Sequence, residues 1–357
     1  MISTISIATA SDKERWNEYV LKHPRGIAYQ LFEWKESVQA AYGFKGIYLI
    51  AGNGNKISGL LPLIRINLPL TSGSLVSLPY CDAGGPLADS PEIERQLIKE
   101  ALNLAHDMGI RTVSVRSSGN MAGLDPETTV NVQKVRMLLS LPDSSEKLLS
   151  SFKAKLRSQV KKPFKDGLTV QSGGLELLDD FYLLFSENMR DLGSPVHSRT
   201  WIRQILSNYR NKAVLFVVKM PDLTPAAGGL LLCHPTVISV PWASSLRRFN
   251  RWNPNMMLYW AFLQFASDNG YPSFDFGRST PDEGTFGFKK QWGATPTPLH
   301  WADFKTTKSQ TENLQPLKKN RSTEISEKRK LAESIIMKMP VPVFKMFGNM
   351  TRKYISL

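Results

Sequence analysis

Residues 105–118 have the sequence AHDMGIRTVSVRSS, and residues 266–280 repeat its pattern as ASDNGYPSFDFGRST. In both stretches a helix-like segment ends in an Ala-x-Asp-x-Gly turn that leads into a short apolar strand. Upstream, residues 215–232 resemble residues 48–63, and each segment lies at nearly the same distance before its Ala-x-Asp-x-Gly turn. The chain therefore carries one α/β unit twice. Duplicated small domains often share a substrate site, so we expect the main cleft at the interface of the two units.

The two copies differ in their polar residues. Asp275 stands where the first copy has Ser114, and Lys289 and Lys290 have no counterpart in the first copy. On an alternating strand Asp275 points away from its two Phe neighbours and toward whatever fills the cleft, and the two lysines on an extended segment point to opposite sides. The sequence therefore predicts that the second copy carries the chemistry.

Length and composition fit two domains. A chain of 357 residues is long for a single core, and 42% hydrophobic residues support packed domains. We expect an N-terminal domain over 1–142, a second domain over 143–305 and a basic tail over 306–357. The five histidines lack metal-ligand spacing and the two cysteines follow apolar runs, so we expect no metal site and no disulfide framework.

The net charge of +14 is concentrated in two segments. Residues 306–357 hold eleven Lys or Arg and four acidic residues, and residues 146–166 hold seven and two. Such segments attract nucleic acid, anionic lipid headgroups or polyphosphate ligands, and the sequence leaves these open. Lys153, Arg157 and Lys161 lie four residues apart and predict a cationic stripe along one helix.

Hydrophobic periodicity and turn residues predict the elements of each unit. Residues 1–45 look helical, and the first unit continues with a hairpin over 46–51 and 57–66, a strand over 74–80, a helix over 91–108 and closing strands over 111–116 and 130–141. The second unit is predicted to contain a helix from 143 to Pro163, a helix over 200–209, strands over 213–220, 226–233 and 236–243, a helix over 254–268, and strands over 273–277 and 298–304.

Parts of both units resemble a known family. Residues 274–280 (FDFGRST) and 288–293 (FKKQWG) are similar to the C-terminal signature of the Fem-like (FemAB) proteins, in particular the branch associated with exosortase, PEP-CTERM and exopolysaccharide systems. Leu156-Arg157, Asn253-Pro-Asn255 and residues 80–86 (YCDAGGP) also match. The resemblance spans most of residues 1–305. It implies an α/β fold of two tandem GNAT-type acyltransferase domains, each a mixed sheet flanked by helices.

The resemblance also implies a function. Fem-like ligases move an amino acid from aminoacyl-tRNA to an amine of a lipid-linked peptidoglycan precursor, and a related group uses other acyl donors. This chain lacks the long helical hairpin of the ligases, which leaves a tRNA donor open. We expect acyl or aminoacyl transfer to an amine of a cell-envelope or exopolysaccharide precursor, with acyl-CoA or aminoacyl-tRNA as donor, no tightly bound cofactor and no DNA partner.

Two other functions stay open. The first is an acyl-CoA-dependent N-acyltransferase that acts on a soluble small molecule. The second is a non-catalytic basic scaffold or binding protein of polysaccharide assembly, which would tolerate loss of the candidate catalytic residues.

Acyl transfer to an amine needs an uncharged nucleophile and donors aimed at the developing oxyanion. The candidate catalytic residues are Asp275, as proton acceptor or orienting group for the amine, and Lys289 and Lys290, as cations for the oxyanion or a phosphate. The simpler interpretations also stay open: a carboxylate satisfied by Arg278 or by backbone amides, and a solvated lysine.

Substrate-binding candidates come from both units. A phosphate-rich donor is suited by Arg side chains and by a helix N-terminus, which points to Arg157, Asn253, Asn255 and Arg278. For the acceptor, stacking and a charge-assisted hydrogen bond point to Trp34, Tyr80 and Asp82, although a tryptophan is often a core residue.

The tail mixes apolar residues with cations, and Pro340 and Pro342 interrupt any long helix. This composition fits peripheral contact with the inner membrane surface, and it fits a segment that packs back on the second domain. No apolar window approaches the length of a spanning helix, so we expect a cytoplasmic location.

Overall fold

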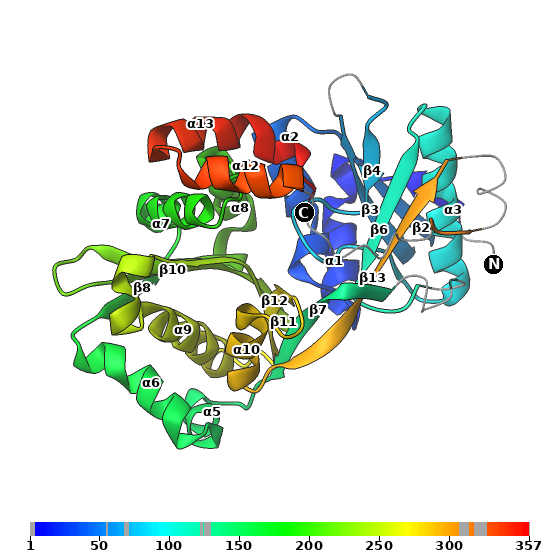
Figure 1. Ribbon diagram of the computed structural model, residues 1–357. Coiled ribbons are helices and arrows are strands. Elements are labelled where there is room, and N and C mark those ends of the chain that lie inside the picture. Colours follow the sequence, from blue (N-terminus) through cyan, green and yellow to red (C-terminus); the bar gives the residue numbers. More distant parts are fainter. Residues whose placement is uncertain are drawn as a thin grey trace.

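The computed structural model describes residues 4–54, 56–67, 71–121, 124, 130–306, 314–317 and 327–356. Its strands form one continuous mixed sheet in the order β1-β2-β3-β4-β6-β13-β7-β12-β11-β10-β9-β8, and β5 pairs with β3 beside this path. The two copies of the unit lie at opposite ends of the sheet, with helices on both of its faces (Figure 1). The fold is therefore α/β with two tandem units.

Apart from the short strand β5 of the first unit, the two units have the same order of helices and strands. The first contains β1 (Thr4–Ile7), α1 (Lys13–Lys22), α2 (Phe32–Tyr42), β2 (Gly46–Asn53), β3 (Lys56–Ile66), β4 (Ser74–Val76), β5 (Leu87–Ala88), α3 (Pro91–Asp107) and β6 (Thr112–Ser117). The second contains β8 (Thr169–Gly173), α7 (Leu178–Asp191), α8 (Arg199–Tyr209), β9 (Ala213–Lys219), β10 (Pro225–His234), β11 (Val237–Ser245), α9 (Pro254–Asp268) and β12 (Ser273–Ser279). In each unit the strand after the long helix runs parallel to an earlier strand of that unit, β6 to β4 and β12 to β11, while the other neighbours within the unit are antiparallel. The duplication predicted from the sequence is confirmed, although β1, β8 and α7 had not been predicted.

The repeated Ala-x-Asp-x-Gly turns mark the ends of α3 and α9. Gly109 and Gly270 have φ angles of 67° and 76°, in the left-handed region that favours glycine after a helix. Ala105 and Ala266 are fully buried. Each turn therefore ends its helix where the chain must pass directly into a parallel strand.

The strand that completes each unit comes from beyond that unit. β7 (Val130–Ser140) follows β6 along the chain but pairs antiparallel with β12, and β13 (Thr295–Lys305) follows β12 but pairs antiparallel with β6. β7 and β13 also pair with each other, and both run through the centre of the molecule in Figure 1. The prediction that residues 130–141 close the first unit is therefore wrong, because the backbone partners of β7 lie in β12 and β13.

The two units share a hydrophobic core on one face of the sheet. It contains Trp16 and Trp34 from the first unit and Phe181 and Trp201 from the second. The rings of Trp34 on α2 and Trp201 on α8 pack edge to face with centroids 5.1 Å apart. Separate cores lie under α3 and under α9. This core fills the contact between α2 and α8, and the two cavities described below lie in the second unit instead of at the interface, where the main cleft was expected.

The basic segment after β7 forms two helices instead of one. α5 (Ser145–Ser151) and α6 (Ala154–Lys165) are separated at Phe152 and Lys153, which have extended backbone angles. At this break the Phe152 ring is buried against Trp260 and Trp292. Pro163 lies inside α6, so the prediction that it ends the helix is wrong.

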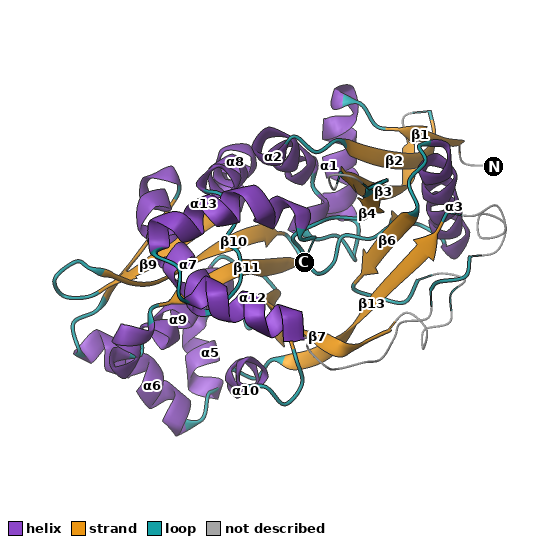
Figure 2. Ribbon diagram, turned by 45° about the horizontal axis from the view of Figure 1, so that its top comes forward, coloured by secondary structure: helices purple, strands orange, loops and turns teal. Residues whose placement is uncertain are grey.

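The tail forms α12 (Glu327–Met337) and α13 (Val341–Thr351), which both contact α7 (Figures 1 and 2). Phe344 is fully buried, and a Cβ added to Gly348 would meet the carbonyl oxygen of Val196 at 2.6 Å. The interpretation that the tail packs on the second unit is therefore confirmed. No helix within the described ranges is long and apolar enough to cross a membrane.

Candidate functional site

Asp275 lies in the middle of β12 at a β-bulge. Its Oδ2 accepts a hydrogen bond from Arg136 Nε of β7 at 2.7 Å, and its Oδ1 accepts one from the backbone N–H of Gly277 at 2.8 Å. The pairing with β7 shifts register between Asp275 and Arg278, and Gly277 has a φ of 74°. The buried carboxylate is thus satisfied by a backbone amide, as one interpretation held, and by Arg136 instead of Arg278.

Lys289 lies on a helix, α10 (Gly284–Gln291), which follows β12. Its buried Nζ donates to the carbonyl oxygens of Gly277 at 3.2 Å and Arg278 at 2.8 Å. Burial lowers the pKa of Lys289 to about 8, although the nearby Asp275 carboxylate acts in the opposite direction. The expectation of an extended segment here is wrong. Because Lys289 and Lys290 are consecutive on a helix, only Lys289 turns inward.

Arg278 follows the bulge and lies where the two units meet. Its Nε is 3.3 Å from Asp82 Oδ1, and both side chains are about one-third exposed (31% and 28%). The ring of Trp301 on β13 contacts two cations, because the guanidinium carbons of Arg278 and Arg116 are each 5.7 Å from its centroid. We call Asp82, Arg116, Arg278 and Trp301 the junction cluster.

Tyr80 borders the junction cluster, but the tail covers it. Its hydroxyl donates to the Lys353 carbonyl at 2.5 Å and its N–H to the Ser356 carbonyl at 2.8 Å. Arg116 donates to the carbonyl and the hydroxyl oxygen of Ser356, both at 2.8 Å. Tyr80 has a φ of 68°, unusual for a non-glycine residue, and burial raises the pKa of its hydroxyl.

Trp34 belongs to the core. Its side chain is fully buried, and Nε1 donates to the Pro79 carbonyl at 3.2 Å, which supports the loop that carries Asp82. A fully buried ring has no free face for stacking, so the prediction of direct acceptor contact by Trp34 is wrong.

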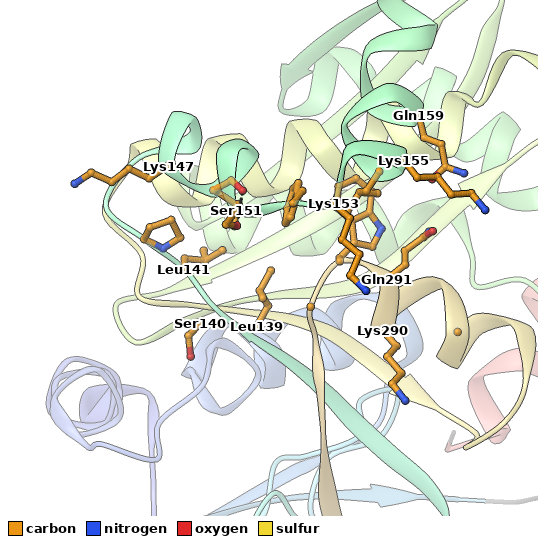
Figure 3. Close-up of a pocket in the computed structure, with 17 residues that line it drawn as sticks. Leu139, Ser140, Leu141, Lys147, Ser151, Lys153, Lys155, Gln159, Lys290 and Gln291 are labelled. Carbon is orange, nitrogen blue, oxygen red and sulfur yellow. Dashed lines mark hydrogen bonds between the residues drawn. The ribbon is translucent and has the colours of Figure 1, made fainter.

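A cavity of about 960 Å³ lies between α5, α6, the end of β7 and α10, and we call it the slot (Figure 3). Its walls include Leu139, Leu148, Phe152, Leu156 and Trp292. Its lysines are Lys147, Lys153, Lys155 and Lys290. Lys290, the other candidate catalytic lysine, is exposed at the slot, whereas Lys289 reaches the bulge that holds Asp275.

A second cavity of about 540 Å³ adjoins the slot, since Gln159 lines both. We call it the basic cavity; its cations are Arg157, Lys161, Lys162 and Lys165, and Asn253 also lines it. Lys153 lines the slot instead, so the predicted stripe is divided between two cavities by the break before α6. Arg157 Nη1 donates to the Phe152 carbonyl and thereby caps α5.

Asn253 and Asn255 flank Pro254, the first residue of α9. Asn253 has a φ of 54° and its side chain makes no capping hydrogen bond. Asn255 is half-buried and does not line the basic cavity. The structure thus brings together Arg157 and Asn253 but places Arg278 in the junction cluster. Within the described part of the chain, no cluster of His, Cys, Asp or Glu has the arrangement of a metal site.

Three residues of this region were not identified from the sequence as site residues. Arg136 pairs with Asp275, and Arg116 and Trp301 belong to the junction cluster. A usable signal exists for the two arginines, since each interrupts an apolar strand, where a charge requires a partner. Trp301 carries no such signal, because its neighbours are set by the pairing of β13 with β6 of the first unit.

The class of protein follows from this arrangement and from comparison with known families. Residues 150–290, which contain α6, the bulge and Lys289, match the family described as acetyltransferase (GNAT) domain. This match supports acyl transfer as the class of chemistry. A comparison with curated protein sequences gave no significant match.

Solved structures show the same fold over most of the chain. The crystal structure of FemX is similar with a TM-score of 0.65 and 17% identity, covering 83% of this chain and 96% of that chain. A tandem GNAT protein from the clavulanic acid biosynthesis pathway has a TM-score of 0.54 and 13% identity, with 85% and 99% covered. The C-terminal domain of a putative lysylphosphatidylglycerol synthetase from Agrobacterium fabrum has a TM-score of 0.56 and 14% identity, with 85% and 94% covered. The chain therefore has a tandem GNAT fold.

Proposed function

We propose that this protein is an acyltransferase that moves an acyl or aminoacyl group onto an amine of a cell-envelope or exopolysaccharide precursor. The observation that carries the proposal is the buried cation Lys289 beside the bulge of β12, inside the segment that matches the GNAT domain. The resemblance to Fem-like proteins, including their exosortase-associated branch, supports the choice of acceptor.

Lys289 is proposed to stabilise the tetrahedral intermediate. A lysine ammonium has three donors, and two of them hold the carbonyl oxygens of Gly277 and Arg278. The third is assigned to the oxyanion that forms when the amine nitrogen attacks the acyl carbonyl. The C–N bond forms, the C–S bond of a thioester breaks, and the amine proton goes to the leaving thiolate. Asp275 and Arg136 are assigned a positioning role, because both side chains are committed to the bulge.

The basic cavity is proposed to hold the phosphates of the donor. Arg157, Lys161 and Asn253 line it beside the N-terminus of α9, and helix N-termini favour phosphate. The slot links this cavity to α10, the helix that carries Lys289. An acyl-CoA donor fits this layout, and aminoacyl-tRNA is the competing donor that the experiment must separate from it.

The acceptor is assigned to the junction cluster. Asp82 offers a carboxylate to an ammonium or sugar hydroxyl, and Arg278 offers a cation to a phosphate. Trp301 provides an aromatic surface beside them. Tyr80 borders this cluster beneath the tail, so a contact of its side chain with the acceptor would require the tail to move. An anionic glycan precursor that carries an amine has the matching groups.

The tail is proposed to contact the cytoplasmic surface of the inner membrane. Exposed apolar side chains of α12 and α13 lie in a segment rich in cations; they are Leu331, Ile335, Val343, Met346 and Met350. We expect the double variant Leu331→Glu/Ile335→Glu to lose binding to vesicles with anionic lipid, because it removes apolar area and adds negative charge. The control is Leu223→Glu, an exposed leucine outside the tail. Equal vesicle binding by all three proteins would exclude this contact.

The function is tested with purified protein and with cells. Transfer of radiolabelled acyl groups from acyl-CoA, and of amino acids from aminoacyl-tRNA, is measured with UDP-linked and lipid-linked amino-sugar acceptors. Mass spectrometry of envelope glycans with and without the gene should reveal a missing acyl group. Transfer only to soluble small amines would favour the small-molecule alternative. Binding of glycan without transfer from either donor would favour the scaffold alternative.

A further inference from the structure

The slot has features of a lipid-binding site that the chemistry above does not require. Seven apolar side chains line it, interspersed with polar and charged ones; they are Leu139, Leu141, Pro142, Leu148, Phe152, Leu156 and Trp292. A volume of about 960 Å³ is at the upper end of the range of cavities that enclose small ligands. Transfer of a short acyl group needs no apolar cavity of this size.

The rim of the slot is cationic. Lys147 is paired with Asp143 at 2.7 Å. Lys153, Lys155 and Lys290 are exposed and form no ion pair with a side chain in the described ranges. In Figure 3 Lys153 and Lys290 come from opposite sides, from the segment between α5 and α6 and from α10. An apolar interior with unpaired cations at its mouth complements an amphiphile with an anionic headgroup.

A buried donor in the slot wall has no partner. Trp292 is 1% exposed and lines the slot, and its indole N–H forms no hydrogen bond within the described residues. Leaving such a group unsatisfied costs free energy. The carbonyl oxygen of a thioester is an acceptor of the kind that this N–H lacks.

We propose that the slot binds the hydrocarbon chain of a long-chain acyl-CoA, whose phosphates occupy the adjoining basic cavity. The basic cavity selects this ligand over a simple fatty acid, because Arg157, Lys161 and Lys165 suit several phosphates better than one carboxylate, while Lys162 is already paired with Asp166, which also lines the cavity. The role of this acyl-CoA as the acyl donor rests on the proposed function. Its binding in the slot does not.

The test compares palmitoyl-CoA, below its micellar concentration, with acetyl-CoA by titration calorimetry on the full chain. Each buried methylene contributes about fourfold in affinity, so we expect palmitoyl-CoA to bind at least about tenfold more tightly. Ser151→Phe fills the slot from an exposed position and should abolish this difference. Ser150→Phe is the matched control, because Ser150 is exposed, adjacent and outside the slot lining.

A second arm tests the cationic rim. The triple variant Lys153→Gln/Lys155→Gln/Lys290→Gln should weaken palmitoyl-CoA binding at low ionic strength, and the loss should shrink as salt is added. The control removes the same charge from three exposed lysines of the first unit, Lys22, Lys45 and Lys56, and should bind as the unmodified protein does.

Two outcomes would overturn the inference. One is equal affinity for the two thioesters, and the other is a chain-length preference that survives Ser151→Phe. Tight palmitoyl-CoA binding without acyl transfer would refute the proposed function and leave the slot assignment standing. Acyl transfer from acetyl-CoA without any chain-length preference would refute the slot assignment and leave the proposed function standing.

Discussion

Asp275 and Lys289 bind opposite ends of the same residue. The carboxylate accepts the N–H of Gly277 at 2.8 Å, and the ammonium donates to the C=O of Gly277 at 3.2 Å. β12 has one extra residue between Asp275 and Arg278, the segment that contains Gly277, whereas the register of β6 with β13 is unbroken. The two charged side chains thus hold the bulge, which is present in β12 and absent from β6 of the first unit. The bulge in turn positions Arg278.

The Asp275–Arg136 pair should be essential for stability. Asp275→Asn keeps an oxygen for the Gly277 N–H but leaves the buried Arg136 unpaired, and breaking a buried pair costs about 3 to 5 kcal/mol. We expect a loss of this size in urea unfolding. Adding Arg136→Met should restore part of the stability, because the uncompensated charge is removed. A double variant that is as unstable as the sum of both single variants would refute the direct coupling.

Lys289 should make stability depend on pH in the alkaline range. Its pKa in the folded protein is about 8 against an ordinary value of 10.5, so between these values the unfolded chain binds more protons. The free energy of unfolding should therefore rise with pH through this window, by up to about 3 kcal/mol from this group alone. Tyrosines and cysteines titrate here too, so the quantity to measure is the difference between the unmodified protein and Lys289→Met. If the difference in free energy of unfolding between the two proteins stays constant from pH 7 to 10.5, the lowered pKa of Lys289 is excluded.

β7 pairs with β12 of the second unit and β13 pairs with β6 of the first unit. Neither half of the chain, divided at residue 142, is therefore expected to fold alone. A fragment of residues 1–142 leaves the edge of β6 without β13, and a fragment of residues 143–305 leaves the edge of β12 without β7. We expect both fragments to aggregate or to lack near-ultraviolet circular dichroism when expressed separately. Co-expression should yield a soluble complex of the two. Independent folding of either fragment would show that a fragment with boundaries at 142 and 305 folds without the strand supplied by the other fragment.

The fold was largely predictable because its main signals are local. Glycines after α3 and α9 and the alternation of short apolar strands predicted the repeated order of elements. The partner of a strand is a non-local choice, so nothing near residues 130–140 revealed that β7 joins β12. The helix α10 was missed because Gly284 and Gly287 lower its helix propensity. Consequently Lys289 was recognised by resemblance, while the geometry that separates it from Lys290 was not.

The most direct measurement is the turnover of Lys289→Met in acyl transfer to an amine acceptor. Removing one oxyanion-stabilising donor lowers kcat by about two to three orders of magnitude, and we expect such a loss in a protein that remains folded. Lys290→Met should instead raise the KM of the donor and keep kcat within about threefold, and Lys22→Met serves as the control for loss of an exposed lysine. Normal kcat in a folded Lys289→Met variant would contradict the assignment of the reaction to this site.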